Sequence, residues 1–154
     1  MAVYQIIKYG EDNGILREKA KAITAITPSI NKLLDDLRDT LYSYNGVGLA
    51  APQIGVSKRA IVVDTGKNFI ELINPEICEQ SGSENAEEGC LSLPGMAGDV
   101  VRAVRVLVKG LNRSGEEIKI EAKGYQARAL QHEIDHLEGI IFTDKATNLR
   151  KVVE

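Results

Sequence analysis

The chain has 154 residues, of which 44% are hydrophobic and 27% are charged, and its formal net charge is −3 at pH 7. These values are typical of one globular domain, so we expect a single domain over residues 1–154, and the negative charge gives no support for direct nucleic-acid binding. No segment has the length and apolarity of a transmembrane helix, and no signal-peptide pattern begins the chain. Two cysteines are too few for a disulfide framework, so the sequence predicts a cytoplasmic protein with no membrane contact.

The first regular element predicted is an amphipathic helix that begins at Pro28. Isoleucine and leucine recur at helical spacing over residues 30–41, a proline suits the first helical position, and the Asn-Gly pair at 45–46 is a helix stop. Residues 46–55 follow as a segment rich in glycine and alanine, which we expect to be irregular.

The middle of the chain is predicted to form strands. Residues 60–64 and 69–73 are short apolar runs with turn residues between them. Residues 100–111 are rich in valine, and the turn sequence at 112–115 separates them from Ile118 and Ile120, which predicts a hairpin.

A second helix is predicted over residues 124–137, because apolar residues recur at helical spacing and Gly139 stands just past the end. The order is helix, several strands, helix. That order predicts an α+β fold with mostly antiparallel sheets. We expect them to pack around this C-terminal helix, with the first helix at the N-terminal side.

The C-terminal helix carries the most informative motif, His132-Glu133-Ile134-Asp135-His136, which has the form H-E-x-x-H. Residues i and i+4 of a helix lie on one face, so both imidazoles can reach one metal ion. Glu133 then lies where it can accept a proton from a water molecule that the ion activates. The motif therefore predicts metal-assisted hydrolysis.

A catalytic metal site of this kind usually has a third protein ligand. The extended zinc-protease motif would place a histidine where this chain has Phe142, and only Asp144 and Glu154 follow as carboxylates, so we expect the third ligand upstream. Cys90 follows a glycine that allows close backbone approach, and its thiolate is a strong ligand. Cys78 stands in a predicted strand as a small buried residue or a bystander, although spacing alone does not separate the two cysteines.

Three segments together resemble the peptide deformylase family, whose motifs are G-x-G-L-A-A-x-Q, E-G-C-L-S and H-E-x-D-H. They stand here, complete and in this order, at residues 46–53, 88–92 and 132–136. The resemblance covers nearly the whole chain. It implies a catalytic domain that hydrolyses the formyl group from the N-terminal formylmethionine of newly synthesised proteins.

The resemblance also implies roles for individual residues. Cys90, His132 and His136 would be the metal ligands. Glu133 would be the general base and then the general acid. The Gln53 side chain and the Leu91 N–H would hold the formyl oxygen as an oxyanion hole. The residues implied in substrate binding are Val47, Gly48, Ala86, Gly89, Tyr125 and Ala129, together with the ring of His132.

The family is typically ferrous, and Zn²⁺, Ni²⁺ or Co²⁺ can occupy the same site. The implied partner is an N-formylmethionyl nascent chain. We expect the enzyme to be a monomer that associates with the ribosome at most transiently. The tail from residue 146 onward is short for ribosome docking, and the cluster of Lys145, Arg150 and Lys151 is typical of a solvated basic face.

Residue types alone leave other interpretations open. H-E-x-x-H by itself also fits a small metalloprotease or a general metal amidase, and a closed structural metal site would need Cys78 as a fourth ligand. Gln53 alone indicates a solvated loop amide. Glu88 is expected either to pair with Arg102 or to be a plain surface carboxylate, and Tyr125 is expected to pack in the core.

Overall fold

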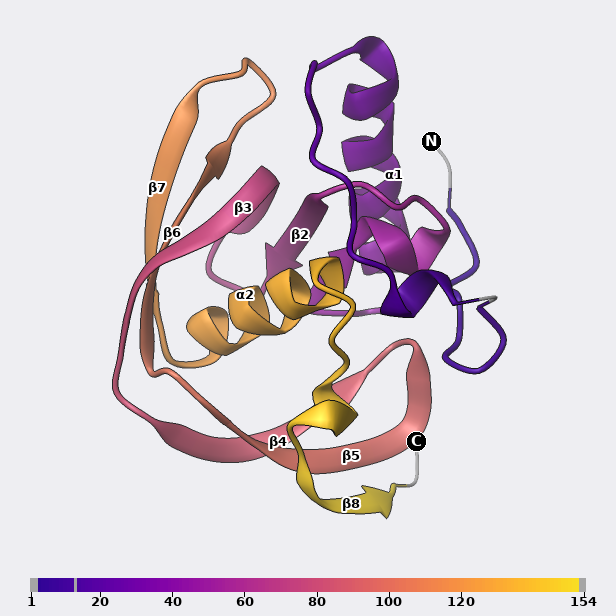
Figure 1. Ribbon diagram of the computed structural model, residues 1–154, viewed down its shortest axis with the longest axis vertical. Helices are drawn as coiled ribbons and strands as arrows, with labels where there is room; N and C mark the ends of the chain where they lie inside the picture. Colours follow the sequence, from indigo (N-terminus) through magenta and orange to yellow (C-terminus); the bar gives the residue numbers. More distant parts are fainter. Residues whose placement is uncertain (1–2, 13, 153–154) are drawn as a thin grey trace.

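The computed structural model describes residues 3–12 and 14–152, so Glu154 lies outside the described residues. Ten helices and strands are found in this part of the chain (Figure 1): α1 (Pro28–Ser43), β1 (Gly48–Ala50), β2 (Ala60–Asp64), β3 (Phe69–Ser81), β4 (Glu84–Cys90), β5 (Leu93–Arg102), β6 (Arg105–Leu111), β7 (Glu117–Lys123), α2 (Gly124–Leu137) and β8 (Thr147–Lys151). Three short 3₁₀ helices lie between them: η1 (Ile15–Arg17), η2 (Ala51–Ile54) and η3 (Phe142–Asp144).

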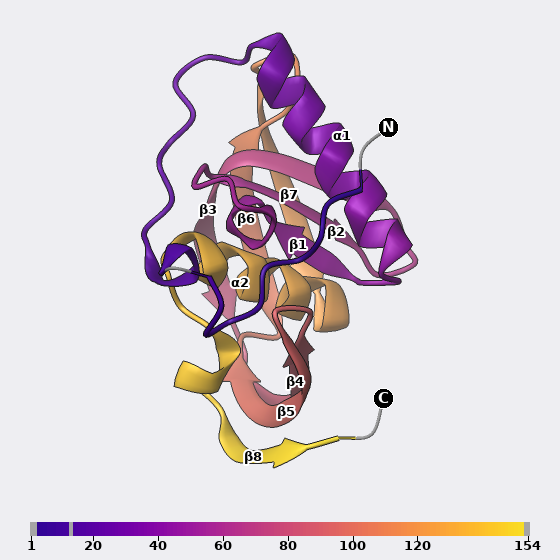
Figure 2. The same ribbon diagram turned by 90° about the vertical axis from the view of Figure 1, so that its right-hand side faces the viewer.

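Five strands form an antiparallel sheet in the order β1-β2-β3-β6-β7. Its interior strand β2 is buried on both sides, because side chains alternate between the two faces of a strand. Ile61 and Val63 join the hydrophobic cluster that includes α2, whereas Ala60 and Val62 join the cluster that includes α1. The two helices therefore cover opposite faces of this sheet (Figure 2).

A second antiparallel sheet has the order β4-β5-β8 and lies on the other side of α2 (Figures 1 and 2). A third hydrophobic cluster, which includes Leu16, Val100, Ile141 and Phe142, packs against this sheet. Helix α2 is thus enclosed between two sheets, and 11 of its 14 residues are buried. This confirms the predicted α+β fold with antiparallel sheets around the C-terminal helix.

Both predicted helices and the strand at residues 60–64 are confirmed. Gly139 lies just beyond α2 with φ of 75°, in the left-handed region that favours glycine. The valine-rich run at 100–111, however, is not one strand. It is divided at residues 103–104 between β5 and β6, which belong to different sheets.

The prediction missed β1, β4 and β8. It gave residues 69–73 as one strand and placed Cys78 in a strand, whereas β3 is continuous from Phe69 to Ser81. β4 and the second half of β3 are rich in charged and polar residues, so they lack the apolar runs on which the strand predictions rested. Within the described residues, no helix combines the length and apolarity needed to cross a bilayer.

Candidate active site

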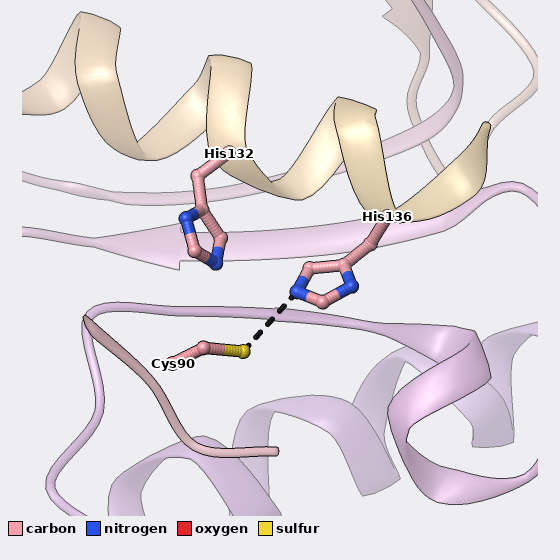
Figure 3. A group of neighbouring side chains, drawn as sticks. All are labelled: Cys90, His132 and His136. Atoms are coloured by element: carbon pink, nitrogen blue, oxygen red, sulfur yellow. Dashed lines mark hydrogen bonds between the residues drawn. The ribbon is translucent and has the colours of Figure 1, made fainter. Parts of the chain in front are cut away.

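Helix α2 presents two histidines on one face, and the end of β4 brings a cysteine to them (Figure 3). His132 and His136 lie one helical turn apart, with ring centroids separated by 5.0 Å. The Sγ atom of Cys90 lies 3.3 Å from Nε2 of His136. One donor atom from each of the three residues lies within 4.8 Å of the others.

This donor set fits a metal ion. One thiolate and two imidazoles are common ligands of Zn²⁺ and of ferrous iron, and three protein ligands leave a coordination position open. Cys78 is exposed on β3 and does not join the group, so the described residues supply no fourth ligand for a closed structural site. The prediction that Cys78 lies in a strand is confirmed. Of its two expected roles, the small buried residue is wrong, and an exposed cysteine outside the group agrees with the bystander.

Glu133 lies beside this group as a buried carboxylate. It is 4% exposed, and its Oε1 atom has no hydrogen-bond partner within the described residues. Burial disfavours the charged form and raises the pKa of Glu133 to about 7. Strand β1 passes so close that a Cβ atom at Gly48 would lie 2.5 Å from Oε2 of Glu133.

Gln53 extends from η2 toward the same group. The side chain is 1% exposed, so the expectation of a solvated amide is wrong. Its Oε1 atom accepts a hydrogen bond from the Ala50 N–H at 2.9 Å, and its Nε2 atom donates to Ser92 Oγ at 3.1 Å. The same Nε2 atom lies 3.6 Å from Cys90 Sγ. The amide nitrogen therefore faces the cysteine and not the solvent.

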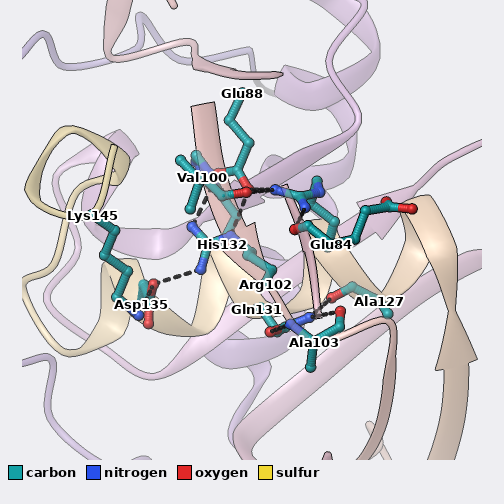
Figure 4. Close-up of polar contacts among 11 residues, drawn as sticks. Glu84, Glu88, Val100, Arg102, Ala103, Ala127, Gln131, His132, Asp135 and Lys145 are labelled. Carbon is teal, nitrogen blue, oxygen red and sulfur yellow. Dashed lines mark hydrogen bonds and ion pairs between the residues drawn. The ribbon is translucent and has the colours of Figure 1, made fainter. Parts of the chain in front are cut away.

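Glu88 supports His132 from behind, as the buried centre of an ion-pair network (Figure 4). Its carboxylate bonds Nδ1 of His132 at 2.9 Å, which leaves Nε2 toward Cys90. Arg102 and Arg128 also bond it, at 2.5 Å and 2.6 Å. Burial alone would raise the pKa of Glu88, but the hydrogen bonds from His132 and Arg102 lower it to about 2.

The predicted pair of Glu88 and Arg102 is thus confirmed, and the network extends further than predicted. Arg102 also bonds Asp135 at 2.8 Å, and Asp135 in turn pairs with Lys145 at 2.9 Å. Arg128 was missed. Its signal in the sequence was an arginine four residues before His132, on the helix face that carries the motif.

A cleft of about 740 Å³ opens in front of these groups. Ten of the twelve predicted site residues line it: Val47, Gly48, Gln53, Gly89, Cys90, Leu91, Tyr125, Ala129, His132 and Glu133. His136 is buried behind the lining, and Ala86 is not part of it. Tyr125 is 58% exposed, so the expectation that it packs in the core is wrong. Lining residues that the sequence did not indicate include Tyr44, Met96 and Val152.

Residues 3–152 match the family model described as polypeptide deformylase. The chain belongs to this family. It is 65% identical to the peptide deformylase of Carboxydothermus hydrogenoformans over 149 residues, which cover 97% of each chain. It is 57% identical to that of Pelotomaculum thermopropionicum over 153 residues, covering 99% of this chain and 97% of the relative. The crystal structure of peptide deformylase from Thermotoga maritima superposes with a TM-score of 0.91 at 41% identity, covering 96% of this chain and 99% of that one.

Peptide deformylases are metal-dependent hydrolases that remove the N-formyl group from nascent peptides. Membership of the family confirms the predicted enzyme class and the resemblance seen in the three motifs. It also agrees with the cysteine–histidine–histidine group beside the cleft. Both of these relatives are bacterial deformylases of similar length.

Proposed function

We propose that this deformylase acts on the N-terminal formylmethionine of newly synthesised proteins, with one divalent metal ion held by Cys90, His132 and His136. The observation that carries the proposal is the convergence of the three donor atoms beside a buried carboxylate that lines a cleft. Two of these residues come from α2 and one from β4, so the group exists only in the folded chain.

Ferrous iron is the metal we propose natively, because the family resemblance implies it, and Zn²⁺, Ni²⁺ or Co²⁺ suit the same donors. When bound, the ion would polarise the formyl carbonyl and lower the pKa of a water molecule. The Glu88 carboxylate fixes the ring orientation of His132 through Nδ1.

Glu133 is proposed as the group that moves the proton. Its buried Oε1 atom has no protein partner within the described residues, and a pKa of about 7 allows the carboxylate both to accept and to release a proton near neutral pH. It would accept a proton from the attacking water and then deliver it to the leaving amine nitrogen.

Two donors are proposed for the oxygen that becomes negatively charged in the transition state. The Nε2 amide of Gln53 faces the metal ligands, and the main chain of Leu91 follows Cys90 directly at the edge of the cleft. Donors fixed in advance lower the barrier because they need no reorganisation as the charge develops.

The substrate backbone is proposed to lie between Gly48 of β1 and Gly89 of β4, which border the cleft on different sheets. Glycine leaves the strand backbone accessible for peptide pairing. The methionine side chain would contact Val47, Tyr125 and Ala129, which line the same cleft. We assign no contact to Ala86.

The enzyme is proposed to be a cytoplasmic monomer that meets the ribosome only transiently. Two of the three basic residues near its C-terminus are engaged within the chain. Lys145 pairs with Asp135 at 2.9 Å, and Arg150 pairs with Asp99 at 3.1 Å. They therefore offer little free positive charge to ribosomal RNA.

The test compares formyl-Met-Ala-Ser with acetyl-Met-Ala-Ser on the metal-loaded enzyme, with formation of the free amine as the readout. The extra methyl of the acetyl group must fit where a formyl group has only hydrogen, so the acetyl peptide should be much slower. Similar kcat/KM values for the two peptides would contradict the proposal and favour a general metal amidase. Cleavage at an internal peptide bond would favour a small protease.

A further inference from the structure

The side-chain amide of Gln53 is held at both ends by protein atoms. Its oxygen accepts a hydrogen bond from the Ala50 N–H at 2.9 Å. A backbone N–H can only donate, so this contact fixes which end of the amide is oxygen. The NH₂ group must then point the other way, toward Ser92 and Cys90.

Ser92 receives one of the two hydrogens of that NH₂ group. Its Oγ atom accepts the bond at 3.1 Å, and the whole residue is 1% exposed. An NH₂ group carries two hydrogens in a fixed plane, so binding one of them to Ser92 sets the direction of the other. The second hydrogen points to Cys90 Sγ, with Nε2 and Sγ 3.6 Å apart. Gln53 lines the cleft at this point, so a bound carbonyl oxygen can take this hydrogen in place of the long contact to sulfur.

The main chains of Gln53 and Ser92 are held by hydrogen bonds that do not depend on the contact between their side chains. The N–H of Ile7 donates to the carbonyl of Gln53 at 2.8 Å, and the N–H of Tyr9 donates to the carbonyl of Ser92 at 2.9 Å. One N-terminal segment thus ties η2 to the turn after β4. Loss of the Ser92 hydroxyl would therefore release the amide and leave both backbones in place.

We propose that Ser92 is a positioning residue for the deformylation reaction, whose hydroxyl aims the second N–H of Gln53 at the oxygen of the formyl group. This rests on the proposed role of Gln53 as an oxyanion donor. The serine acts only through the amide, so its contribution must disappear when the amide is absent.

A double-mutant cycle tests this dependence, with kcat and KM measured for wild type, Ser92→Ala, Gln53→Ala and the double variant, all loaded with Zn²⁺. Removing an oxyanion donor typically costs about 10²–10³ in kcat, which is the loss expected for Gln53→Ala. Losing one neutral hydrogen bond that aims this donor should lower kcat about two- to ten-fold in Ser92→Ala, with KM little changed. In the Gln53→Ala background, Ser92→Ala should change kcat less than about two-fold.

Any other outcome would overturn either the role of Gln53 in the proposed function or the role of Ser92. A Gln53→Ala variant with normal kcat would overturn the role of Gln53 in the proposed function, and the role of Ser92 with it. A large loss in Gln53→Ala, combined with no effect of Ser92→Ala or with equal effects in both backgrounds, would overturn the role of Ser92 alone. Ser92→Gly also lacks the hydroxyl and replaces Ser92→Ala in the cycle if the latter does not fold.

A readout independent of turnover is the ¹⁵N NMR signal of the Gln53 side-chain NH₂, identified by its absence in Gln53→Ala. In Ser92→Ala its hydrogens should exchange faster with solvent, and an unchanged exchange rate would contradict the proposal. Thr40→Val is the matched control. Thr40 is a fully buried hydroxyl that accepts a hydrogen bond from the Tyr4 N–H at 3.0 Å, and its loss should leave kcat and the Gln53 signal unchanged.

Discussion

Replacing Gly48 with alanine should disable the enzyme by displacing Glu133. A Cβ atom at position 48 would lie 2.5 Å from Oε2, 2.9 Å from Cγ and 3.0 Å from Cδ of Glu133. Carbon and oxygen atoms that are not bonded prefer separations well above 3 Å, so one of the two groups must move. The strand is paired to β2 at this residue, so the carboxylate is the group that can give way.

The magnitude follows from that displacement. General acid–base help is typically worth about 10²–10⁴ in rate, and a misplacement of about 1 Å can cost about 10²-fold. We therefore expect kcat of Gly48→Ala to fall by about 10²-fold. The metal content should stay near that of wild type, because the change does not touch Cys90, His132 or His136.

The assay is steady-state kinetics on formyl-Met-Ala-Ser with metal content measured on the same samples. Gly89→Ala is the comparison variant, since it places the same methyl on the opposite side of the cleft, where its nearest neighbour is the Met96 carbonyl oxygen at 3.4 Å. It should retain far more of kcat than Gly48→Ala. Normal kcat in Gly48→Ala, or loss of metal together with activity, would refute the reasoning.

Three further predictions concern the metal site and the stability of the chain. Glu133→Gln should keep its metal while kcat falls by at least about 10²-fold, which metal analysis and kinetics on the same samples can check. Normal activity in this variant would contradict the role of Glu133 in proton transfer. Cys90→Ala should lose or weaken metal binding and Cys78→Ala should not, which a Zn²⁺ titration of both variants decides; the reverse pattern would contradict the ligand assignment. The hydrogen bond from Arg17 lowers the pKa of Asp144 below its ordinary value of 3.8. The pair therefore stabilises the fold fully at pH values above 3.8, and this stabilisation is lost as the pH falls through the lowered pKa. Both side chains are more than a third exposed, so Asp144→Asn should cost at most about 1 kcal/mol near neutral pH, and the difference in Tm from wild type should shrink in acid; a difference that grew in acid would contradict this.

The helices could be predicted because their signals are local. Apolar spacing, the proline at the start of α1 and the glycine after α2 act within a few residues of one another. The strand at residues 60–64 was found for a similar reason, since burial on both faces makes it a continuous apolar run. β4 could not be found this way. Its seven residues include three glutamates, and they are held as a strand by pairing with β5.

The division of residues 100–111 shows the same limit. Valines over the whole run favour extended structure, but they do not say which sheet each half joins. The chain leaves the three-stranded sheet after Arg102 and enters the five-stranded sheet at Arg105. Pairing with distant strands decides this, and no pattern within the run records it.

The chemistry of the site could be predicted from the chain alone, because residue types and short spacings set which groups can bind a metal and move a proton. H-E-x-x-H places two imidazoles on one helix face, and the three ordered motifs indicated the family. The orientation of those groups depends on the packing of distant segments. That packing selected Cys90 over Cys78, buried the Gln53 amide against Ser92, and brought Arg128 to the carboxylate of Glu88. These contacts join segments from 39 to 46 residues apart, so they arise from the packing of two sheets against one helix and leave no local signal in the chain.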